Sequence, residues 1–498
     1  MKKFKVLAAV LVLVLCAVMF AACDGGKPEA SATPAPSATP GAKEIVMKPG
    51  DTYKIYFVEN KTENMWVDGK TIGVRAQSFR EKWLNFQEEY GVTVTWIQPP
   101  FEEGGAWWSD VTSAANSGEP VCDLFNMGGP CFIPQSITVN GSVASHLYED
   151  LSLYSEYTNF DDAGLWDQSA IEAVGYYGDK LHIVVPTDYG FNGVGGNMVT
   201  YFSGALLENG GHSADEVYNL YKEGNWTWEQ FRQMCIDCAD IDKGVYGTTT
   251  TRNYLSVYAL IYANGASVLG KDAETGAPKF VADSNEAIDA VNFFIKLAKD
   301  DKVVLTDGGF SQEEAPYFRD GKSVFMITYA NRVIEGMNTT GATTILDNSD
   351  TLKYGIVLPP KGPNATDYVS EKNWYTPWAA FKGHENMAGV VQCLSMYVAP
   401  EYAPDSAEAM MVLDSEASVY FDDKRSIQTL KDIINKNITT DYMVWWDLGP
   451  DSAMNGVGEL TTFKMAAWIA GETTPEQTYA ENKDALNAYF ANYFGANS

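Results

Sequence analysis

The chain has few of the residues that metal and redox sites need. Its 498 residues include four histidines and seven cysteines, and the histidines lie far apart along the sequence. A zinc site needs clustered histidine and cysteine ligands, and a calcium loop needs closely spaced carboxylates; neither pattern occurs. The phosphate-binding pattern GxxxxGK(S/T) is also absent, because Pro316 stands where the first glycine would precede Gly321-Lys322-Ser323. We therefore expect no metal and no cofactor.

Positive charge is scarce as well. Lysine and arginine total 35 against 65 aspartates and glutamates, so the formal net charge is −30. Binding of nucleic acid needs a basic surface that neutralises phosphates, so we expect no nucleic-acid partner. The apolar content of 46% excludes a wholly disordered chain. Because single cores stop growing near ~250–300 residues, the length predicts at least two lobes.

Long apolar runs are missing beyond the N-terminus. Residues 6–22 are apolar throughout and follow three lysines, which is typical of a secretion signal. The run Phe20-Ala21-Ala22-Cys23 resembles the bacterial lipobox, in which the cysteine is lipidated, although Phe20 replaces the usual leucine. We predict a lipoprotein signal peptide over residues 1–22 and lipidation of Cys23. An ordinary cleaved signal or an anchor helix is the alternative.

A low-complexity segment follows the proposed lipid anchor. The sequence SATP occurs at residues 31–34 and again at residues 37–40. A segment rich in proline, alanine, serine and threonine buries nothing and stays extended. Residues 23–43 are therefore predicted to be a lipid anchor and flexible linker. We expect the mature chain to be extracytoplasmic and anchored to the cell membrane by its lipid.

The remaining cysteines are odd in number, so they cannot all pair within the chain. Cys235 and Cys238 form a CxxC motif, which would suit a redox or zinc site. Together with Phe231 and Met234 they have helical spacing, which favours two buried structural thiols. A disulfide between Cys122 and Cys131 stays open.

The first part of the chain alternates strands and helices. Alternating apolar residues predict strands near residues 53–58, 92–96 and 121–126, with helices before Gly91 and over 107–116. This order predicts a parallel α/β sheet, on which ligands bind at the carboxyl ends of the strands. Asn126 ends the third strand and is a candidate binding residue. Further elements are predicted as strands at 181–185, 324–327 and 354–358 and as helices from Trp228 and over 287–298, 388–397 and 426–434.

Seven short segments, in this order, resemble motifs of the family 1 extracellular solute-binding proteins. These are the sugar-binding lipoproteins of ABC importers and are related to maltose-binding protein. The segments are SGEPVCDL (117–124), YEDLS (148–152), LHIVVP (181–186), WTWEQF (226–231), YANGA (262–266), FRDGKSVFM (318–326) and YGIVLPPKGP (354–363). The sequence departs from the family where its YNK motif reads Thr200-Tyr201-Phe202. The departures leave the subgroup and the ligand open.

The resemblance implies an α/β, two-lobe periplasmic-binding-protein-like fold, with an interlobe cleft and about three hinge crossovers. The N-terminal lobe would take residues 50–190 and 376–435. The C-terminal lobe would take residues 195–375 and 436–498. A carbohydrate ligand would bind in the cleft, and the membrane permease subunits of an ABC transporter would be the protein partners of a monomer.

A sugar offers flat C–H faces and a rim of hydroxyls, so its site needs aromatic rings beside short polar side chains. The candidates lie at strand ends or at the crossings that the resemblance implies. We predict a substrate-binding set of Asn126, Tyr189, Phe191, Asn192, Tyr254, Tyr329, Asn331, Trp374, Tyr375, Trp445, Trp446 and Asp447. Each aromatic residue could instead belong to the core.

Three other functions compete with this hypothesis. A secreted glycoside hydrolase would need two carboxylates on either side of the scissile bond, and no motif singles out such a pair. A scaffold or adhesin would use the linker only for display. A binding protein for a peptide or a cation would keep the fold and change the ligand. We expect a binding protein and not an enzyme.

Overall fold

The computed structural model describes most of the chain beyond the predicted linker. The described residues are 44–57, 74–97, 113, 117–127, 138–139, 142–143, 147–177, 179–250, 255–274, 277–306, 314–334, 344–372, 375–404, 406–435, 438–440, 457–458 and 464–495. Residues 1–43, with the predicted signal, linker and Cys23, lie outside them. Within the described part, no helix is long and apolar enough to cross a membrane.

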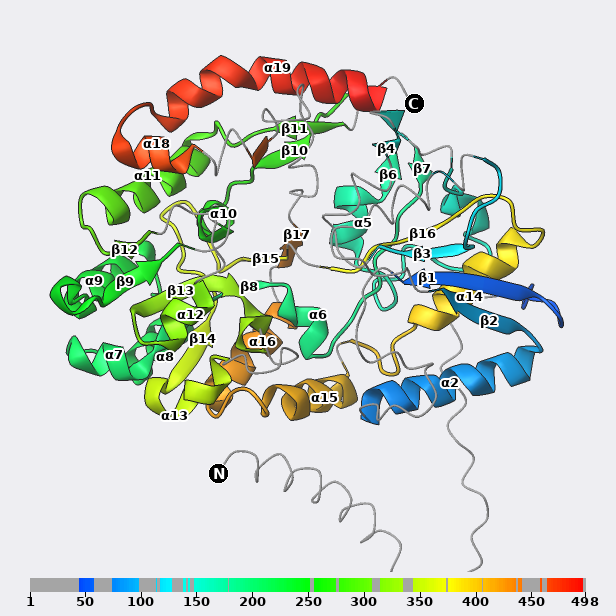
Figure 1. Cartoon of the computed structure of the whole chain (residues 1–498), viewed down its shortest axis with the longest axis horizontal. Helices are drawn as coiled ribbons and strands as arrows, with labels where there is room; N and C mark the ends of the chain where they lie inside the picture. The colour runs from blue at the N-terminus through cyan, green and yellow to red at the C-terminus, as the bar shows by residue number, and fades with distance from the viewer. Residues whose placement is uncertain are drawn as a thin grey trace, which may run out of the picture.

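A four-stranded sheet organises the first lobe (Figure 1). Its order is β16-β3-β1-β2, with the first three strands along the chain parallel and β16 antiparallel to β3. The three early strands confirm the predicted parallel sheet, whereas most of the predicted helix over 107–116 lies outside the described residues. The strands are β1 (Thr52–Phe57), β2 (Thr93–Ile97), β3 (Leu124–Asn126) and β16 (Trp378–Ala380).

Two helices supply aromatic residues to the core of this lobe. Trp83 lies on α2 (Val74–Tyr90), and Tyr397 lies on α14 (Met387–Val398). Their ring centroids are 4.5 Å apart, and Tyr397 also lies 5.3 Å from Trp378 of β16. Burial of such large rings is the main stabilising contribution available to a small sheet.

A five-stranded mixed sheet organises the second lobe on the other side of the molecule (Figure 1). Its order is β12-β9-β13-β8-β14. The strands β9, β12 and β13 are parallel, and β8 runs antiparallel to both β13 and β14. Their bounds are β8 (Met198–Ser203), β9 (Tyr246–Thr249), β12 (Val304–Leu305), β13 (Ser323–Tyr329) and β14 (Tyr354–Val357).

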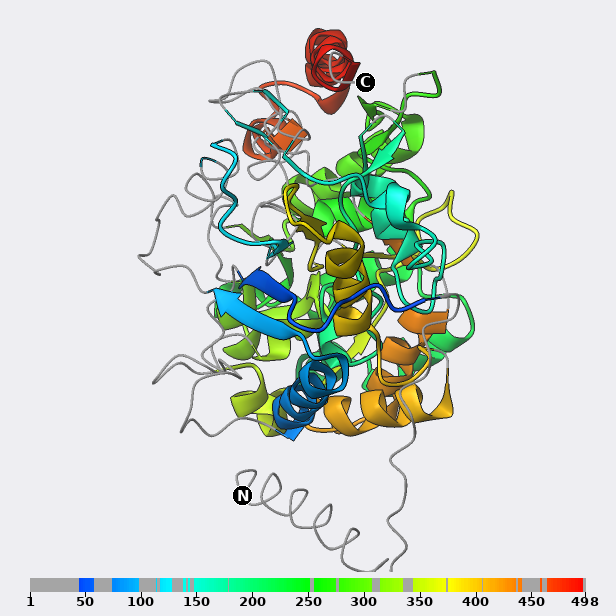
Figure 2. The same ribbon diagram turned by 90° about the vertical axis from the view of Figure 1, so that its right-hand side faces the viewer.

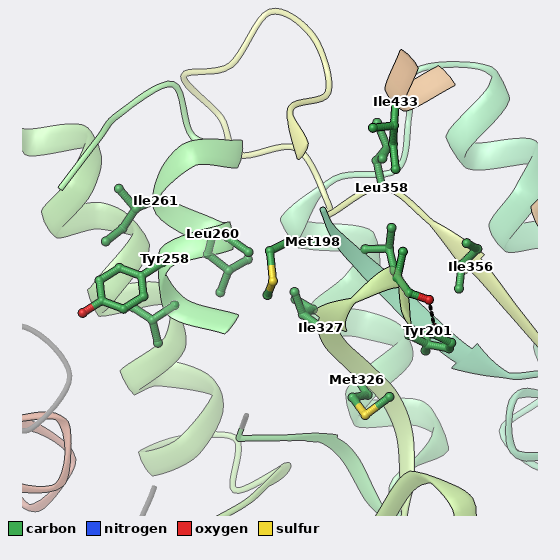
Figure 3. Close-up of a cluster of buried hydrophobic side chains, with 14 of the residues drawn as sticks. Met198, Tyr201, Tyr258, Leu260, Ile261, Met326, Ile327, Ile356, Leu358 and Ile433 are labelled. Carbon is green, nitrogen blue, oxygen red and sulfur yellow. Dashed lines mark hydrogen bonds between the residues drawn. The ribbon is translucent and has the colours of Figure 1, made fainter. Parts of the chain in front are cut away.

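The centre of this sheet is buried and mainly apolar. All six residues of β8 are buried, and its side chains pack with those of β13, β14 and the neighbouring helices (Figure 3). The hydroxyl of Tyr201 donates a 2.5 Å hydrogen bond to the carbonyl of Ala330, which satisfies the buried phenol. Strand β8 is mainly apolar, and it includes two buried polar residues, Thr200 and Ser203.

Helices surround the second sheet. The predicted start of a helix at Trp228 is confirmed, because the Thr227 hydroxyl accepts a hydrogen bond from the Gln230 amide. The surrounding elements are α7 (Gly204–Asn209), α8 (Ala214–Lys222), α9 (Trp228–Cys238), η3 (Ile241–Lys243), α10 (Leu255–Ala263), α11 (Asn285–Lys299), α12 (Glu314–Arg319), η5 (Ala330–Ile334), η6 (Leu346–Asn348) and α13 (Ser349–Leu352).

The chain passes between the two sheets three times within the described residues. The first passage, residues 184–198, contains α6 (Phe191–Gly195). The second has 370–372 and 375–378 as its described residues and begins with β15 (Ser370–Lys372). The third, residues 399–406, joins α14 to α15 (Ala407–Ala417). The first two passages lie side by side, because Val184 pairs with Trp378 and Asn197 pairs with Lys372.

The third passage comes earlier in the chain than the predicted lobe boundaries place it. The predicted first lobe includes residues 376–435, whereas α16 (Lys424–Asn435) packs on β14 of the second sheet. Ser426 Oγ accepts the Ile356 amide at 3.0 Å, and Thr429 Oγ1 donates to the Ile356 carbonyl at 3.1 Å. These hydrogen bonds tie α16 to β14, and sequence periodicity does not reveal them.

The remaining elements lie around the hinge and along the top of the view in Figure 1. β17 (Ile438–Thr440) pairs in parallel with β15. α19 (Pro475–Gly495) packs on β11 and also contacts β5, and Figure 2 shows it end-on at the top of the view. The others are β4 (Thr138–Val139), β5 (Ser142–Val143), η2 (Leu151–Tyr154), α5 (Gln168–Val174), β6 (Tyr176–Tyr177), β7 (Lys180–Leu181), β10 (Leu269–Lys271), β11 (Pro278–Phe280) and α18 (Met465–Ala470).

Candidate functional site

In both sheets, the carboxyl ends of the parallel strands lie next to the passages that connect the two lobes. In the first sheet β3 ends at Asn126, which is paired with Trp378 of the second passage. In the second sheet β13 ends at Tyr329, which is paired with Met198 at the end of the first passage. Ligands of open α/β sheets bind beyond the carboxyl ends of strands. The region around the passages is therefore the candidate site.

Asn126 occupies the predicted position at the end of β3. It is buried, and it lies between Phe57 of β1 and Trp378 of β16 in the sheet. The amide of the next residue, Met127, donates a 3.0 Å hydrogen bond to the carbonyl of Pro377. The end of β3 is thus bound to the second passage by its backbone.

The structure brings two other predicted groups together at the second sheet. α6, which contains Phe191 and Asn192, packs on η5, which contains Asn331. Gly195 of α6 lies close to Asn331 of η5, because a Cβ added at Gly195 would lie 3.0 Å from Cβ of Asn331. Tyr329 is half-buried just before η5, with the guanidinium of Arg332 5.4 Å from its ring centroid.

Backbone contacts connect the second passage with the second sheet. Asn197 forms an antiparallel bridge with Lys372, and its carbonyl accepts the Ala330 amide at 2.9 Å. The Ser370 hydroxyl donates to the Met198 carbonyl at 2.8 Å. The start of β8, the end of β13 and β15 therefore form one hydrogen-bonded unit at the hinge.

A buried ion pair lies at the same place. Lys372 Nζ is 2.8 Å from Oδ2 of Asp167, and the two side chains are 9% and 15% exposed. Oδ1 of Asp167 accepts the Ala170 amide and the Ser169 hydroxyl, so the same carboxylate caps α5. Burial raises the pKa of Asp167, but Lys372 and these hydrogen bonds outweigh it, and the net pKa is lowered.

Three of the predicted aromatic residues are buried in this structure. Phe191 is 3% exposed, and its ring centroid lies 4.8 Å from that of Tyr420 and 6.2 Å from that of Phe421. The ring centroid of Tyr189 lies 6.3 Å from that of Tyr402 in the third passage. Tyr375 is buried in the main hydrophobic cluster. The packing of Phe191 is that of a core residue, whereas Tyr329 keeps part of its surface open.

Other members of the predicted site fall outside what the structure describes. These are Tyr254, Trp374, Trp445, Trp446 and Asp447, together with the side chain of Asn192. Their roles in substrate binding stay predictions.

The cysteines are structural in character. Cys235 and Cys238 are buried free thiols, as predicted, and burial is the main cause that raises both pKa values, that of Cys238 to about 12. Cys122 is also a buried free thiol, whereas Cys131 lies outside the described residues. Within the described residues, no group of three or more His, Cys, Asp or Glu side chains is placed to hold a metal ion.

The predicted site does not include three residues that meet at the hinge. Asp167, Asn197 and Lys372 come together there, although Asp167 and Lys372 are 205 positions apart. Asn197 follows two glycines, Gly195 and Gly196, and directly precedes an apolar strand. That polar residue between glycines and a strand was the available signal. No local pattern marks Asp167 as the partner of Lys372.

The two sheets with their adjacent passages define the class of fold, which is that of the two-lobe substrate-binding proteins of ABC transporters. Solved structures of this class match nearly the whole chain, and they confirm the predicted fold. The cyclic α-maltosyl-1,6-maltose binding protein of Arthrobacter globiformis aligns with a TM-score of 0.59 at 12% identity, covering 89% of this chain and 100% of that one.

Two further structures illustrate the range of ligands on this fold. An ABC substrate-binding protein of Listeria monocytogenes in complex with cycloalternan has a TM-score of 0.53 and 15% identity, over 89% of this chain and 98% of the other. UgpB of Mycobacterium tuberculosis in complex with glycerophosphocholine has a TM-score of 0.54 and 13% identity, over 88% and 98%. No family model and no curated protein sequence matches the chain.

Proposed function

We propose that the protein is an extracytoplasmic, lipid-anchored substrate-binding protein. It captures a carbohydrate between its two lobes and delivers it to the permease subunits of an ABC transporter. The proposal rests on one observation: in both sheets, a strand ends next to the passages between the lobes. Asn126 lies at this end of β3 in the first sheet, and Tyr329 lies at this end of β13 in the second. The carbohydrate-binding structures with the same fold support the choice of ligand class.

The mechanism is capture followed by closure. Adjacent passages can act as a hinge, because a few residues at the ends of elements absorb the rotation while each sheet stays rigid. Aromatic rings would cover the flat faces of the sugar, and amide and carboxylate groups would bind its hydroxyls. A sugar promotes closure only if it binds the closed form more tightly than the open form. The closed form would then be the one that the permease recognises.

The test is a thermal-shift screen of the purified protein against mono- and oligosaccharides, peptides, glycerophosphodiesters and cations. A ligand present at about one hundred times its dissociation constant stabilises the native state by ~2.7 kcal/mol, which is readily visible. Titration calorimetry would confirm each hit. Binding should be weakened by Trp374→Ala and Trp446→Ala, at two of the three tryptophan positions predicted from the sequence.

Each competing function has its own outcome in this design. A peptide or glycerophosphodiester hit without any sugar hit would keep the fold and replace the ligand class. Turnover of aryl-glycosides would identify a glycoside hydrolase. A protein that binds nothing and does not become more compact on addition of any solute would be a scaffold.

The lipid anchor needs a separate test. Expressed in a bacterium that lipidates its secreted proteins, the chain should fractionate with membranes and carry a lipid mass on Cys23. The Cys23→Ala variant should lose that mass and appear in the soluble extracytoplasmic fraction. A wild-type chain that is secreted without lipid would contradict the anchor and leave solute binding untouched.

A further inference from the structure

His212 lies in the turn between α7 and α8, and its imidazole ring bridges two carboxylates. Nδ1 is 3.0 Å from Oε2 of Glu216 on α8, and Nε2 is 3.2 Å from Oδ2 of Asp237 on α9. The side-chain amide of Gln233 donates a 2.8 Å hydrogen bond to the other oxygen of Asp237. The ring therefore joins the turn before α8 to the end of α9, and α7 and α9 also pack together at this end of the second lobe (Figure 1).

The bridge is complete only while the imidazole is protonated. An ionised carboxylate accepts hydrogen bonds and does not donate them, and a neutral imidazole has one donor and one acceptor nitrogen. After loss of the proton, one ring nitrogen would face a carboxylate oxygen, with two acceptors opposed. Burial lowers the pKa of His212, but the hydrogen bonds to Glu216 and Asp237 outweigh it, and the net pKa is raised above its ordinary value of 6.5.

Two other carboxylates near this turn have cationic partners of their own. Glu208 of α7 pairs with Lys353, and Asp215 of α8 pairs with Arg425. The charges of Glu216 and Asp237 act on His212 directly. The protonation of the ring is therefore governed by one carboxylate from α8 and one from α9.

The turn that His212 holds also covers a buried thiol. The backbone amide of His212 donates a 2.9 Å hydrogen bond to the Leu207 carbonyl, and Sγ of Cys238 donates to the same carbonyl at 3.9 Å. Gly210 packs on the thiol so closely that a Cβ added to it would lie 2.3 Å from Sγ. Asp237, which binds the ring, directly precedes Cys238 in α9. Residues 207–212 therefore bind the ring and shield Cys238 at the same time.

Cys235 is shielded by a different part of the fold. It is buried on α9 one turn before Cys238, and a Cβ added to Gly247 of β9 would lie 2.5 Å from its Cβ. Opening of the turn between α7 and α8 would leave this contact with β9 in place. Cys235 is thus an internal reference for Cys238.

We propose that His212 is a pH-sensitive staple, and that Cys238 becomes a site of thiol modification when the ring loses its proton. With the ring charged, the two carboxylates hold the turn over the thiol. With the ring neutral, one hydrogen bond is lost, the turn opens locally, and a small disulfide reaches Sγ. The Cys238 thiolate attacks that disulfide, whose S–S bond breaks as a mixed disulfide forms, and the released thiolate takes a proton from solvent.

The direction of the pH effect follows from the raised pKa of His212. A group whose pKa is higher in the folded protein contributes stability that is complete below its unfolded pKa, and this contribution is lost as the pH rises through the folded pKa. The turn is therefore closed in mildly acidic solution and opens on the alkaline side. This inference does not depend on the proposed function, because no solute takes part in it.

The test measures how fast 4,4′-dithiodipyridine labels each thiol of the intact protein, with the sites located by peptide mass spectrometry. Each native rate is divided by the rate for the same thiol in urea-unfolded protein at the same pH, which removes the intrinsic pH dependence of the thiol. The ratio reports the population of the locally open state. From pH 6 to pH 9 it should rise about fivefold for Cys238, the change expected for one lost hydrogen bond, and stay constant for Cys235.

Three variants separate the staple from other effects. His212→Gln removes the titrating group, so its ratio for Cys238 should be raised at pH 6 and unchanged at pH 9. Asp237→Asn presents an amide that can donate to a neutral ring, so its ratio should rise less with pH than that of the wild type. Lys243→Gln is the matched control, because it breaks an exposed ion pair with Asp240 just beyond α9 and should behave as the wild type does.

The inference is overturned if the wild-type ratio for Cys238 is the same at pH 6 and pH 9, or if His212→Gln keeps the wild-type rise. It is also overturned if Cys235 and Cys238 gain reactivity in parallel, because the pH would then act on the whole lobe and not on the turn. If His212→Gln does not fold, Asp237→Asn decides, and a full wild-type rise in that variant would overturn the inference. Failure in any of these ways leaves solute binding untouched.

Discussion

Lys372 on the second passage donates a 2.8 Å charge-assisted hydrogen bond to Asp167, the residue that caps α5. Ile171 of α5 packs in the core of the first lobe, so the pair fastens the passage to that lobe. Neither side chain is freely hydrated. The hinge is therefore held by a buried charge pair as well as by backbone pairing.

Breaking this pair should destabilise the protein strongly. Lys372→Met leaves a buried carboxylate without its cation, which typically costs about 3–5 kcal/mol. Lys353→Met is the control, because Lys353 and Glu208 form an ion pair with side chains that are 60% and 59% exposed. Loss of an exposed pair should change the free energy of unfolding by less than ~1 kcal/mol. Urea titrations of both variants measure the difference, and equal effects would contradict a special role for the hinge pair.

The same pair predicts a dependence of stability on acid. The pKa of Asp167 is lower in the folded protein than its ordinary value of 3.8. Its contribution to stability is therefore complete above the unfolded pKa and is lost as the pH falls through the folded pKa. The difference in unfolding free energy between the wild type and Asp167→Asn should be constant from pH 7 to about pH 5 and shrink below about pH 4. A difference that does not change with pH would show that the carboxylate charge is unimportant.

The two thiols of the CxxC motif should be inert in the native state. Both are buried, and their pKa values are raised, so almost no thiolate exists near neutral pH. Ellman's reagent should react with them only after unfolding in urea. Rapid labelling of Cys235 or Cys238 in the native protein, located by peptide mass spectrometry, would contradict a structural role and revive the redox interpretation.

Phe191 and Tyr329 should differ in what their loss affects. Phe191 packs against Tyr420 and Phe421, so Phe191→Ala should cost ~3–5 kcal/mol of stability through the cavity that it leaves. Tyr329 is half-buried at the strand end, so Tyr329→Ala should lower sugar affinity, by about tenfold, with a smaller loss of stability. Calorimetric titration and urea unfolding on both variants separate the effects. The reverse pattern would make Phe191 the ligand platform.

The arrangement of strands could be predicted because its signals are local. Alternating apolar residues mark β1 and β2, and the turn before residue 121 marks the approach to β3. The end of β3 at Asn126 follows from the same pattern. The role of an aromatic residue at a strand end could not be predicted in this way, since its ring can pack against a sugar or against another ring. Phe191 meets Tyr420 only because α15 and α16 return to the second sheet, more than two hundred residues later.

The sequence by itself determined the class of fold, through the motifs that resemble a known family. It also determined β1, β2, β3, β13 and β14 and the start of the CxxC helix α9, whereas β8 was not among the predicted strands. Periodicity, caps and turn residues act over a few positions and can be read along the chain. Tertiary structure alone decided which lobe receives α16 and which aromatic rings become core. It also decided that Asp167, Asn197 and Lys372 meet at the hinge. Such contacts depend on how distant segments pack together. The free energy of that packing does not produce a local pattern in the sequence.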